Sequence, residues 1–332
     1  MARPDVDLPA ARGTGSPRFS KALMHSAARL YYLEDATQAD IAKRLGTSRP
    51  TVSRLLSEAR REGIVRIEVV APVDHDLASI AREVEAAVGL SSVWLSELPT
   101  RGSTVGAALA PALADALRAV GLGRGDGLLV SSGRTIYEAA QAELPDLHGV
   151  LVAPMIGGHD EPEPWYATNE IMRQIAQKVG GTPTFLYAPA LPSPDLFETL
   201  SADPAALVVL ERWRTARCAV MGVGAPPLTR TSLPRFMASD ISVLRESVGD
   251  VCSRFYDAQG APLPFPGSER LFATSFETLK AIPATIAVAA GERKVPGILA
   301  GARAGYFNQL VTDVPTAVAL LTAAEDAAPP VI

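Results

Sequence analysis

Cysteines and histidines are scarce in this chain. The two cysteines, Cys218 and Cys252, match no metal-ligand spacing, which argues against a disulfide scaffold and a zinc module. We expect both to be buried thiols. The histidines are equally scattered, and they are His25, His75, His148 and His159. The sequence therefore predicts no metal site and no cofactor.

Long apolar runs are also missing. The longest runs, such as residues 205–210 and 285–290, are far shorter than the roughly 18 residues that a membrane-spanning helix needs. Residues 1–17 lack the charged-then-apolar layout of a signal peptide. We therefore expect a soluble, cytoplasmic protein with no membrane contact.

Acidic and basic residues are unevenly distributed along the 332 residues. Between Arg18 and Val70 the chain holds ten Lys or Arg residues and six Asp or Glu residues, whereas residues 71–332 hold 19 basic and 28 acidic residues. A small basic module joined to a large acidic one is typical of a protein that binds nucleic acid at one end. A chain of this length is also expected to form two folding units.

The basic module contains three helical patterns. Leu23, Ala27, Leu30 and Tyr31 recur at helical spacing. Residues 36–46 indicate a second helix, capped by Thr37 and closed by Gly46, and a third helix follows with Thr47 or Ser48 as its cap and Pro50 in its first turn. The residues expected to form a small core between the second and third helices are Ile41, Leu45, Val52 and Leu55.

This pattern predicts a helix-turn-helix, in which the later helix enters the major groove of DNA and the earlier one meets the phosphates. At about 100° per residue, the face of the third helix opposite Val52 and Leu56 is polar and basic. The predicted DNA-binding residues are Thr37, Gln38, Ser48, Arg49, Pro50, Thr51, Ser53 and Arg54. Residues 64–70 alternate as a strand and predict a wing. The alternative is a three-helix protein-binding module with a solvated charged face.

The segment QADIAKRLGTSRPTVSRLLSEARREGIVRI resembles the DNA-binding domain of SorC-type bacterial sugar-responsive transcriptional regulators, in which SR-x-x-VSRLL recurs. The resemblance continues in the family's order through DGLLVSSGRTIYEAA, VLVAPMIGG, AVMGVG, SVGDVCSRFYDAQG, AAGERKVPGILAGARAG and NQLVTDVPTAVALL, so that it covers Ser20 to Thr322. It implies a homodimer or homotetramer that binds double-stranded operator DNA of a carbohydrate-metabolism operon. It also implies control by a phosphorylated sugar or a related metabolite.

The larger region reads as an α/β fold. Strand-like apolar runs alternate with helical stretches, and these runs are residues 127–130, 149–156, 218–224, 285–290 and 308–313. The alternation predicts a Rossmann-like, mostly parallel sheet wrapped by helices, and the resemblance implies similarity to phosphosugar isomerases. The expected segments are a flexible tail (1–17), the helix-turn-helix domain (18–70), a linker (71–78) and an effector-binding and oligomerisation domain (79–332). We expect a helix over 74–88 and a hinge between Val70 and Asp76.

The turn that follows residues 127–130 is a candidate anion site. Ser131, Ser132 and Gly133 lie in the turn, and Thr135 lies near the start of a helix. Backbone amides, hydroxyls and the helix dipole favour a phosphate there, with Arg134 as a charged contact. The alternative is a surface arginine beside a tight turn. The family uses this loop for the effector phosphate, although many members carry an aromatic residue where this chain has Ser132.

Two further places are candidates for ligand contact. Gly157 and Gly158 end the next apolar run, where they let the backbone approach a ligand closely or simply form a turn. Asn169 opens the following helix and either caps it or bonds the ligand.

Asp250 and Lys294 complete the predicted effector site. In the family, the acidic residue of the element GDVCSRFYD and the lysine of an A-G-G-x-x-K element face the effector. Here the second element reads AAGERK, with Ala290 in place of one glycine. The alternatives are an ion pair of Asp250 with Arg254 at i, i+4 on a helix and a solvated lysine.

Two classes of function fit these patterns. The first is a transcription factor that a sugar phosphate controls. The second is a phosphosugar isomerase or deaminase with an appended helix-turn-helix. Because the candidate loops hold no evident acid/base set, we predict the regulator and no catalytic residues.

Overall fold

The computed structural model describes residues 19–34, 36–65, 77–96, 103–230, 234–235 and 244–326. The chain divides into two compact units, residues 1–73 and 74–332, and no helix in the described ranges is long and apolar enough to cross a membrane. The predicted tail, most of the predicted wing and the whole of the predicted hinge lie outside the described residues.

The smaller unit consists of α1 (Lys21–Tyr32), α2 (Gln38–Arg44) and α3 (Arg49–Arg61). This confirms the three predicted helices. Ile41, Val52 and Leu55 are fully buried between them, as predicted, whereas Leu45 is only partly buried. Tyr31, which the helical pattern places on the apolar face of α1, is 36% exposed instead.

The larger unit is built on a seven-stranded sheet in which every neighbouring pair of strands is parallel. In spatial order the strands are β1 (Ser92–Ser96), β10 (Gln309–Asp313), β9 (Ala284–Val288), β5 (Cys218–Gly222), β2 (Gly127–Val130), β3 (Leu151–Pro154) and β4 (Thr182–Pro183). The five predicted runs form β2, β3, β5, β9 and β10, which confirms the predicted sheet. The sequence reading missed β1 and β4.

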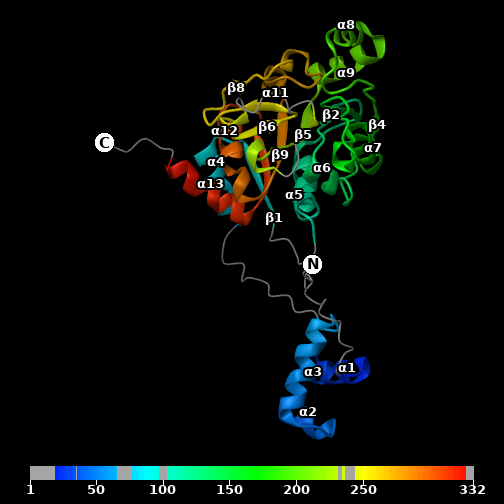
Figure 1. Cartoon of the computed structure of the whole chain (residues 1–332), viewed down its shortest axis with the longest axis vertical. Coiled ribbons are helices and arrows are strands. Elements are labelled where there is room, and N and C mark those ends of the chain that lie inside the picture. The colour runs from blue at the N-terminus through cyan, green and yellow to red at the C-terminus, as the bar shows by residue number, and fades with distance from the viewer. Residues whose placement is uncertain are drawn as a thin grey trace, which may run out of the picture. The chain divides into compact units, whose positions relative to one another are not determined.

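Helices cover both faces of this sheet (Figure 1). One face packs against α4 (Leu77–Val88), α9 (Pro204–Thr215), α11 (Phe276–Ala281), α12 (Val295–Arg303) and α13 (Val314–Asp326). The other packs against α5 (Val105–Val120), α6 (Arg134–Ala139) and α7 (Thr168–Lys178). Along β2 the buried side chains alternate between the two cores, with Leu129 in the first and Leu128 and Val130 in the second. Within the described ranges, the remaining helices are α8 (Pro194–Ala202) and the short 3-10 turns η1 (Pro164–Tyr166), η2 (Pro227–Thr229), η4 (Ser268–Arg270) and η5 (Glu292–Lys294).

A small antiparallel sheet holds Asp250. It consists of β6 (Gly249–Val251), β7 (Arg254–Tyr256) and β8 (Pro262–Leu263), with Asp250 opposite Phe255. The alternative of a helical Asp250–Arg254 pair is therefore wrong, because the segment forms a hairpin. Arg254 instead donates hydrogen bonds to the carbonyls of residues 271, 273 and 274. Both cysteines are free, and Cys252, in the hairpin turn, is only partly buried rather than buried.

The strand order reverses beside β2. From β2 the chain moves outward through β3 and β4, and it then returns to β5, β9 and β10 on the other side. Open parallel sheets bind ligands at the carboxyl ends of the strands where the order reverses. The loops that follow β2, β5 and β9 are therefore the place to look for a site.

Candidate functional site

The predicted DNA-reading face lies on the solvent side of α3. The residues of this face that are exposed are Arg49, Pro50, Ser53 and Arg54, while Thr51 is partly exposed. The opposite side is buried and packs on α1 and α2. The packing thus leaves the polar and basic side of α3 free for a ligand.

Two of the predicted DNA-binding hydroxyls also form helix caps. Ser48 caps α3, since its Oγ accepts the Thr51 amide at 3.4 Å and bonds the Thr51 hydroxyl at 2.8 Å. Thr37 caps α2, since its Oγ1 accepts the Asp40 amide at 3.2 Å and donates to the Asp40 carboxylate at 2.6 Å. These caps fix the starts of both helices.

In the larger unit, Ser131 joins the ends of β2 and β5. Its amide donates to the Val220 carbonyl at 3.0 Å, and its Oγ accepts the Gly222 amide at 3.1 Å. The same hydroxyl donates to the Ser132 carbonyl at 2.9 Å. Ser131 is buried, so its polar groups hold the turn in shape.

Gly133 places the first turn of α6 at the sheet edge. Its φ of 119° lies in a region that favours glycine, and its amide donates to the Trp165 carbonyl at 2.9 Å. In the described part of the chain, the amides of Arg134 and Thr135 have no acceptor. Arg134 is exposed, and its Cζ lies 4.1 Å from the centre of the Trp165 ring. The turn therefore offers two free amides, with the guanidinium held aside on an aromatic ring.

Backbone packing accounts for Gly157 and Gly158. A Cβ at Gly157 would lie 2.6 Å from the Ala188 carbonyl oxygen, so that position requires glycine. The Gly157 amide donates to the Phe272 carbonyl at 2.9 Å, and the Gly158 amide donates to the Ala188 carbonyl at 2.7 Å. Both glycines thus fasten the loop after β3 to neighbouring backbone.

Asn169 does not cap α7, since the cap position is Ala167 and Asn169 lies in the first turn of the helix. Its Nδ2 donates to the Leu186 carbonyl at 2.9 Å, and its Oδ1 accepts the Leu186 amide at 3.1 Å. The structure therefore ties α7 to the segment after β4 through this side chain.

Asp250 is paired within the protein. Its Oδ1 accepts a hydrogen bond from Arg230 Nη2, and its Oδ2 accepts the Ser253 amide at 3.0 Å. The side chains of Asp250 and Arg230 are only 12% and 19% exposed. Arg230 Nε also donates to the Ala225 carbonyl at 2.7 Å. A mostly buried ion pair thus connects the loop after β5 to the small sheet.

Lys294 lies at the start of α12, as predicted, and Gly291 forms the turn before it with a φ of 108°. Burial first, and the nearby charge of Arg230 second, lower the pKa of the Lys294 ammonium to about 8, although Asp250 and Glu138 oppose the shift. Lys294 makes no hydrogen bond or ion pair with any other described side chain. An anion is the natural partner of such a desolvated ammonium.

Glu138, His159 and Arg230 also lie at this site, although the sequence did not predict them as site residues. Glu138 influences Lys294 and accepts the amide of Gly106 at 2.9 Å. Burial lowers the pKa of His159 to about 4, with the charge of Asp250 opposing, so this imidazole is neutral near pH 7. Only His159 had a sequence signal, because it directly follows the Gly157–Gly158 pair. Arg230 and Glu138 are recognisable only from their neighbours in space.

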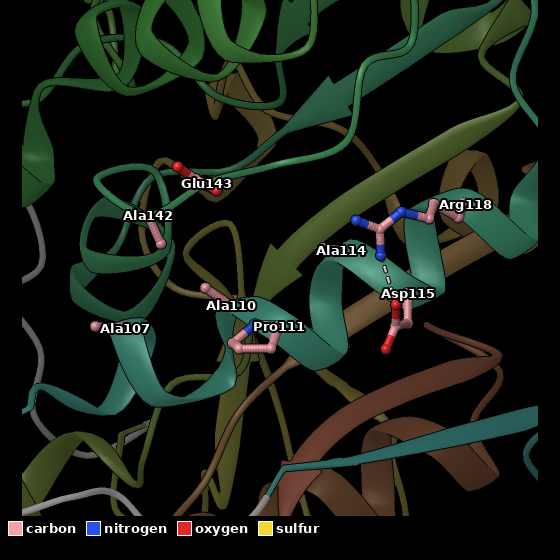
Figure 2. A pocket seen from close by; sticks show the side chains of 8 residues that line it. All are labelled: Ala107, Ala110, Pro111, Ala114, Asp115, Arg118, Ala142 and Glu143. Atoms are coloured by element: carbon pink, nitrogen blue, oxygen red, sulfur yellow. Dashed lines mark hydrogen bonds and ion pairs between the residues drawn. The ribbon is translucent and has the colours of Figure 1, made fainter.

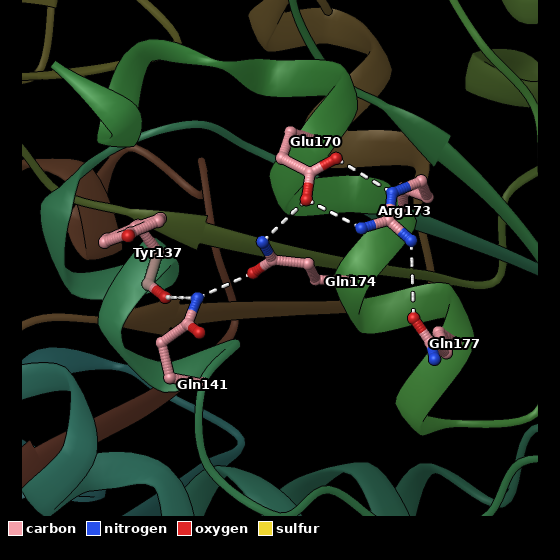
Figure 3. A network of polar contacts seen from close by, with 6 residues as sticks. All are labelled: Tyr137, Gln141, Glu170, Arg173, Gln174 and Gln177. Carbon is pink, nitrogen blue, oxygen red and sulfur yellow. Dashed lines mark hydrogen bonds and ion pairs between the residues drawn. The ribbon is translucent and has the colours of Figure 1, made fainter.

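Two other polar features of the larger unit lie apart from these residues. Figure 2 shows a hollow of about 320 Å³, lined by α5 and by Ala142 and Glu143, with the Asp115–Arg118 ion pair at its rim. Figure 3 shows a surface network in which Glu170 accepts hydrogen bonds from Arg173 and Gln174. None of the predicted effector residues lines the hollow. The described residues contain no cluster that would hold a metal ion.

Comparison with known proteins identifies relatives over nearly the whole chain. Residues 89–322 match the family model described as "Putative sugar-binding domain", and residues 19–71 match a Crp-like helix-turn-helix domain. The deoxyribonucleoside regulator of Bacillus subtilis is 31% identical over 92% of this chain and 98% of its own length. The sorbitol operon regulator of Klebsiella pneumoniae is 30% identical over 89% of this chain and 96% of its own.

Solved structures agree with the sequence relatives. The full-length sorbitol operon regulator SorC from Klebsiella pneumoniae superposes with a TM-score of 0.66 and 28% identity, covering 90% of this chain and 98% of that one. A DeoR family transcriptional regulator from Listeria monocytogenes gives a TM-score of 0.65 at 25% identity, covering 74% of this chain and all of that one.

Proposed function

Because this chain belongs to the SorC-type family of bacterial transcriptional regulators, we propose that it binds operator DNA through α2 and α3 and that a sugar phosphate sets its affinity for the operator. The operon concerned serves carbohydrate metabolism. The cellular place of this action is the cytoplasm, where the DNA lies.

One observation carries the effector part of this proposal. Lys294, Arg230 and Asp250 come from three segments that are distant in sequence, yet their charges act on one another at the carboxyl edge of the sheet. Two cations beside the free amides of Arg134 and Thr135 suit a phosphate. The Asp250 carboxylate and the neutral His159 suit sugar hydroxyls.

The effector site that we propose combines the predicted residues with those that the structure adds. Its predicted members are Ser131, Ser132, Gly133, Arg134, Thr135, Gly157, Gly158, Asn169, Asp250 and Lys294. Of these, Ser131, Gly157, Gly158 and Asn169 act by holding the loops in place, since their polar groups are engaged by protein atoms. Arg230, His159 and Glu138 join the site from neighbouring loops.

Symmetry links the effector to DNA. A homodimer or homotetramer held together by residues 79–332 would present two copies of α3 about 34 Å apart, one turn of DNA, to a palindromic operator. A coupling of about 1 to 3 kcal/mol between the two sites changes operator affinity roughly 5- to 150-fold.

The direct test is selection of genomic DNA fragments by the purified full-length chain, followed by titration of the selected fragment with and without a panel of sugar phosphates. We expect one fragment to bind with sequence preference and at least one sugar phosphate to change its affinity. Failure to select any fragment would sink the DNA-binding function.

The enzyme alternative has its own test. We propose that the chain is no enzyme, because its relatives are named as regulators and fold similarity is no sign of turnover. The purified chain is incubated with ribose 5-phosphate or glucosamine 6-phosphate, and product is assayed. Steady turnover that Lys294→Met abolishes would overturn this part of the proposal.

A further inference from the structure

The smaller unit carries a hollow of about 610 Å³ where the ends of its three helices meet. Its lining residues come from the end of α1, the start of α2 and the start of α3, and they are Tyr31, Tyr32, Ala36, Thr37, Gln38, Ala39 and Arg49. None of these described lining residues carries a carboxylate. The hollow lies beside the predicted reading face, because Arg49 is part of both.

Four of the lining side chains are hydrogen-bond donors without a partner in the described ranges. The phenols of Tyr31 and Tyr32, the Gln38 amide and the Arg49 guanidinium make no hydrogen bond or ion pair there. The two tyrosine rings meet edge to face with their centres 4.9 Å apart. Partly exposed phenols with apolar bodies packed together leave their hydroxyls available to a ligand.

The two neighbouring carboxylates that the structure describes, Glu34 and Asp40, already have partners. Glu34 pairs with Arg29 at 3.2 Å and with Arg44 at 3.3 Å. Asp40 accepts the Thr37 hydroxyl and lies outside the lining. The hollow is therefore a place of unpaired donors and one unpaired positive charge, in a segment where ten basic residues stand against six acidic ones between Arg18 and Val70.

We propose that this hollow seats a phosphodiester group of the DNA backbone, with Tyr31 and Tyr32 as phosphate-binding residues and Arg49 as its counter-charge. The inference rests on the proposed DNA binding and assigns Arg49 to the backbone rather than to a base. A phosphodiester has two non-bridging oxygens that accept several donors at once. Its capture at the start of α3 fixes how that helix enters the groove, and Ser53 and Arg54 are left to read bases.

Phosphate contacts are independent of sequence, so a mixed-sequence duplex is a suitable probe beside the selected operator fragment. The full-length chain is compared with Tyr31→Phe/Tyr32→Phe, Arg49→Gln and Arg54→Gln. Tyr187→Phe is the control, because it removes an exposed phenol from the larger unit. Affinities are measured over a range of salt concentrations.

The double tyrosine variant is expected to bind both duplexes about 3- to 10-fold more weakly with an unchanged salt slope, since it loses neutral hydrogen bonds only. Arg49→Gln is expected to weaken binding to both duplexes equally and to lower the slope by about 0.9, the value of one released counterion. Arg54→Gln should weaken binding to the operator fragment alone. Tyr187→Phe should match the wild type.

Three outcomes would overturn the assignment. If the double tyrosine variant binds DNA as tightly as the wild type does, the hollow does not contact DNA. The proposed function would still stand in that case, because the wild type binds DNA. A loss by Arg49→Gln that is confined to the operator fragment would return Arg49 to base reading. A defect of these variants towards an acidic peptide such as polyglutamate, but not towards duplex DNA, would assign the hollow to a protein.

A second measurement removes the charge from the DNA rather than from the protein. A methylphosphonate placed at single positions of the operator fragment removes one backbone charge at a time. We expect one position at which the methylphosphonate weakens binding of the wild type but does not weaken binding of Arg49→Gln any further. Full additivity at every position would contradict the proposal.

Discussion

At the scale of single residues, the proposed effector site contains one ion pair and, within the part of the chain that the structure describes, one lysine without a counter-charge. Asp250 neutralises Arg230 through a mostly buried hydrogen bond, whereas Lys294 has no such partner among the described side chains. Burial is the largest cause of the low Lys294 pKa. We therefore make one prediction for the lysine and a different one for the ion pair.

Raising the pH through about 8 should weaken the binding of a sugar phosphate. A bound anion favours the protonated Lys294 and raises its pKa above about 8. The affinity is therefore complete while the pH stays below the pKa of the free lysine, about 8, and it falls as the pH rises past that value. The phosphate does not contribute, because its second pKa lies near 6. Calorimetry at several pH values measures the effect, and Lys294→Met should bind weakly at every pH. A wild-type affinity that is flat from about pH 7 to about pH 10 would contradict this role.

Asp250→Asn should lower the free energy of unfolding by roughly 1 to 3 kcal/mol, because it leaves the Arg230 guanidinium mostly buried without its counter-charge. Urea unfolding measures the change. Glu170→Gln is the matched control, since its ion pair with Arg173 is 45% exposed on both sides and should contribute less than about 1 kcal/mol. Equal losses in both variants would show that burial of the Arg230 pair has no special weight.

At the scale of helices and strands, the sequence predicted long elements with a clear period and caps better than it predicted short strands and their turns. Period and caps were enough for α3, because Ser48, Pro50 and the buried face of Val52 and Leu55 all agree locally. The strand β4 escaped because it has two residues, and the β6–β7 hairpin escaped because its turn uses Cys252 and Ser253 at positive φ rather than glycine.

The site was predictable only in part for the same reason. Ser131 and Gly133 lie in the turn after β2, and Lys294 lies in the 3-10 turn after β9, so their place at the sheet edge can be predicted from the sequence. Arg230 and Glu138 act through neighbours that are distant in sequence, and no local pattern marks them. Asn169 shows the converse, because its position at the opening of a helix suggested a cap or a ligand contact, whereas its side-chain amide bonds the backbone of Leu186.

The contact between α5 and α6 gives a prediction at this scale. A Cβ at Gly106 would lie 2.2 Å from the Thr135 carbonyl oxygen, so Gly106→Ala should push the effector turn aside. We expect a loss of about 1 to 3 kcal/mol in stability together with weaker sugar phosphate binding. Gly123→Ala, whose Cβ would meet its nearest atom at 3.7 Å, should stay within about 0.5 kcal/mol of the wild type. Unchanged ligand affinity in Gly106→Ala would disprove the link.

The two faces of α3 should separate in a mutational test. Leu55 is fully buried, so Leu55→Ala should destabilise the smaller unit by about 2 to 5 kcal/mol. Arg54 is exposed, so Arg54→Ala should leave unfolding unchanged and weaken operator binding by about 1 to 3 kcal/mol. Unfolding curves and DNA titrations distinguish the two. An Arg54→Ala variant that binds the operator like the wild type would refute the assignment of the reading face.

At the scale of the whole molecule, the two parts of the chain differ in both charge and fold. The segment that carries α1 to α3 is basic, whereas residues 71–332 hold 28 acidic and 19 basic residues. An acidic unit is repelled by DNA phosphates, and the loops of a parallel sheet suit a small ligand. A chain built in this way can report the presence of a metabolite only if the two sites are coupled.

The most direct test is therefore the affinity of the full-length chain for its selected operator fragment, measured with and without the sugar phosphate that binds most tightly. We predict a change of about 5- to 150-fold in the wild type and little change in Lys294→Met. An operator affinity that is identical with and without bound sugar phosphate in the wild type would contradict the account.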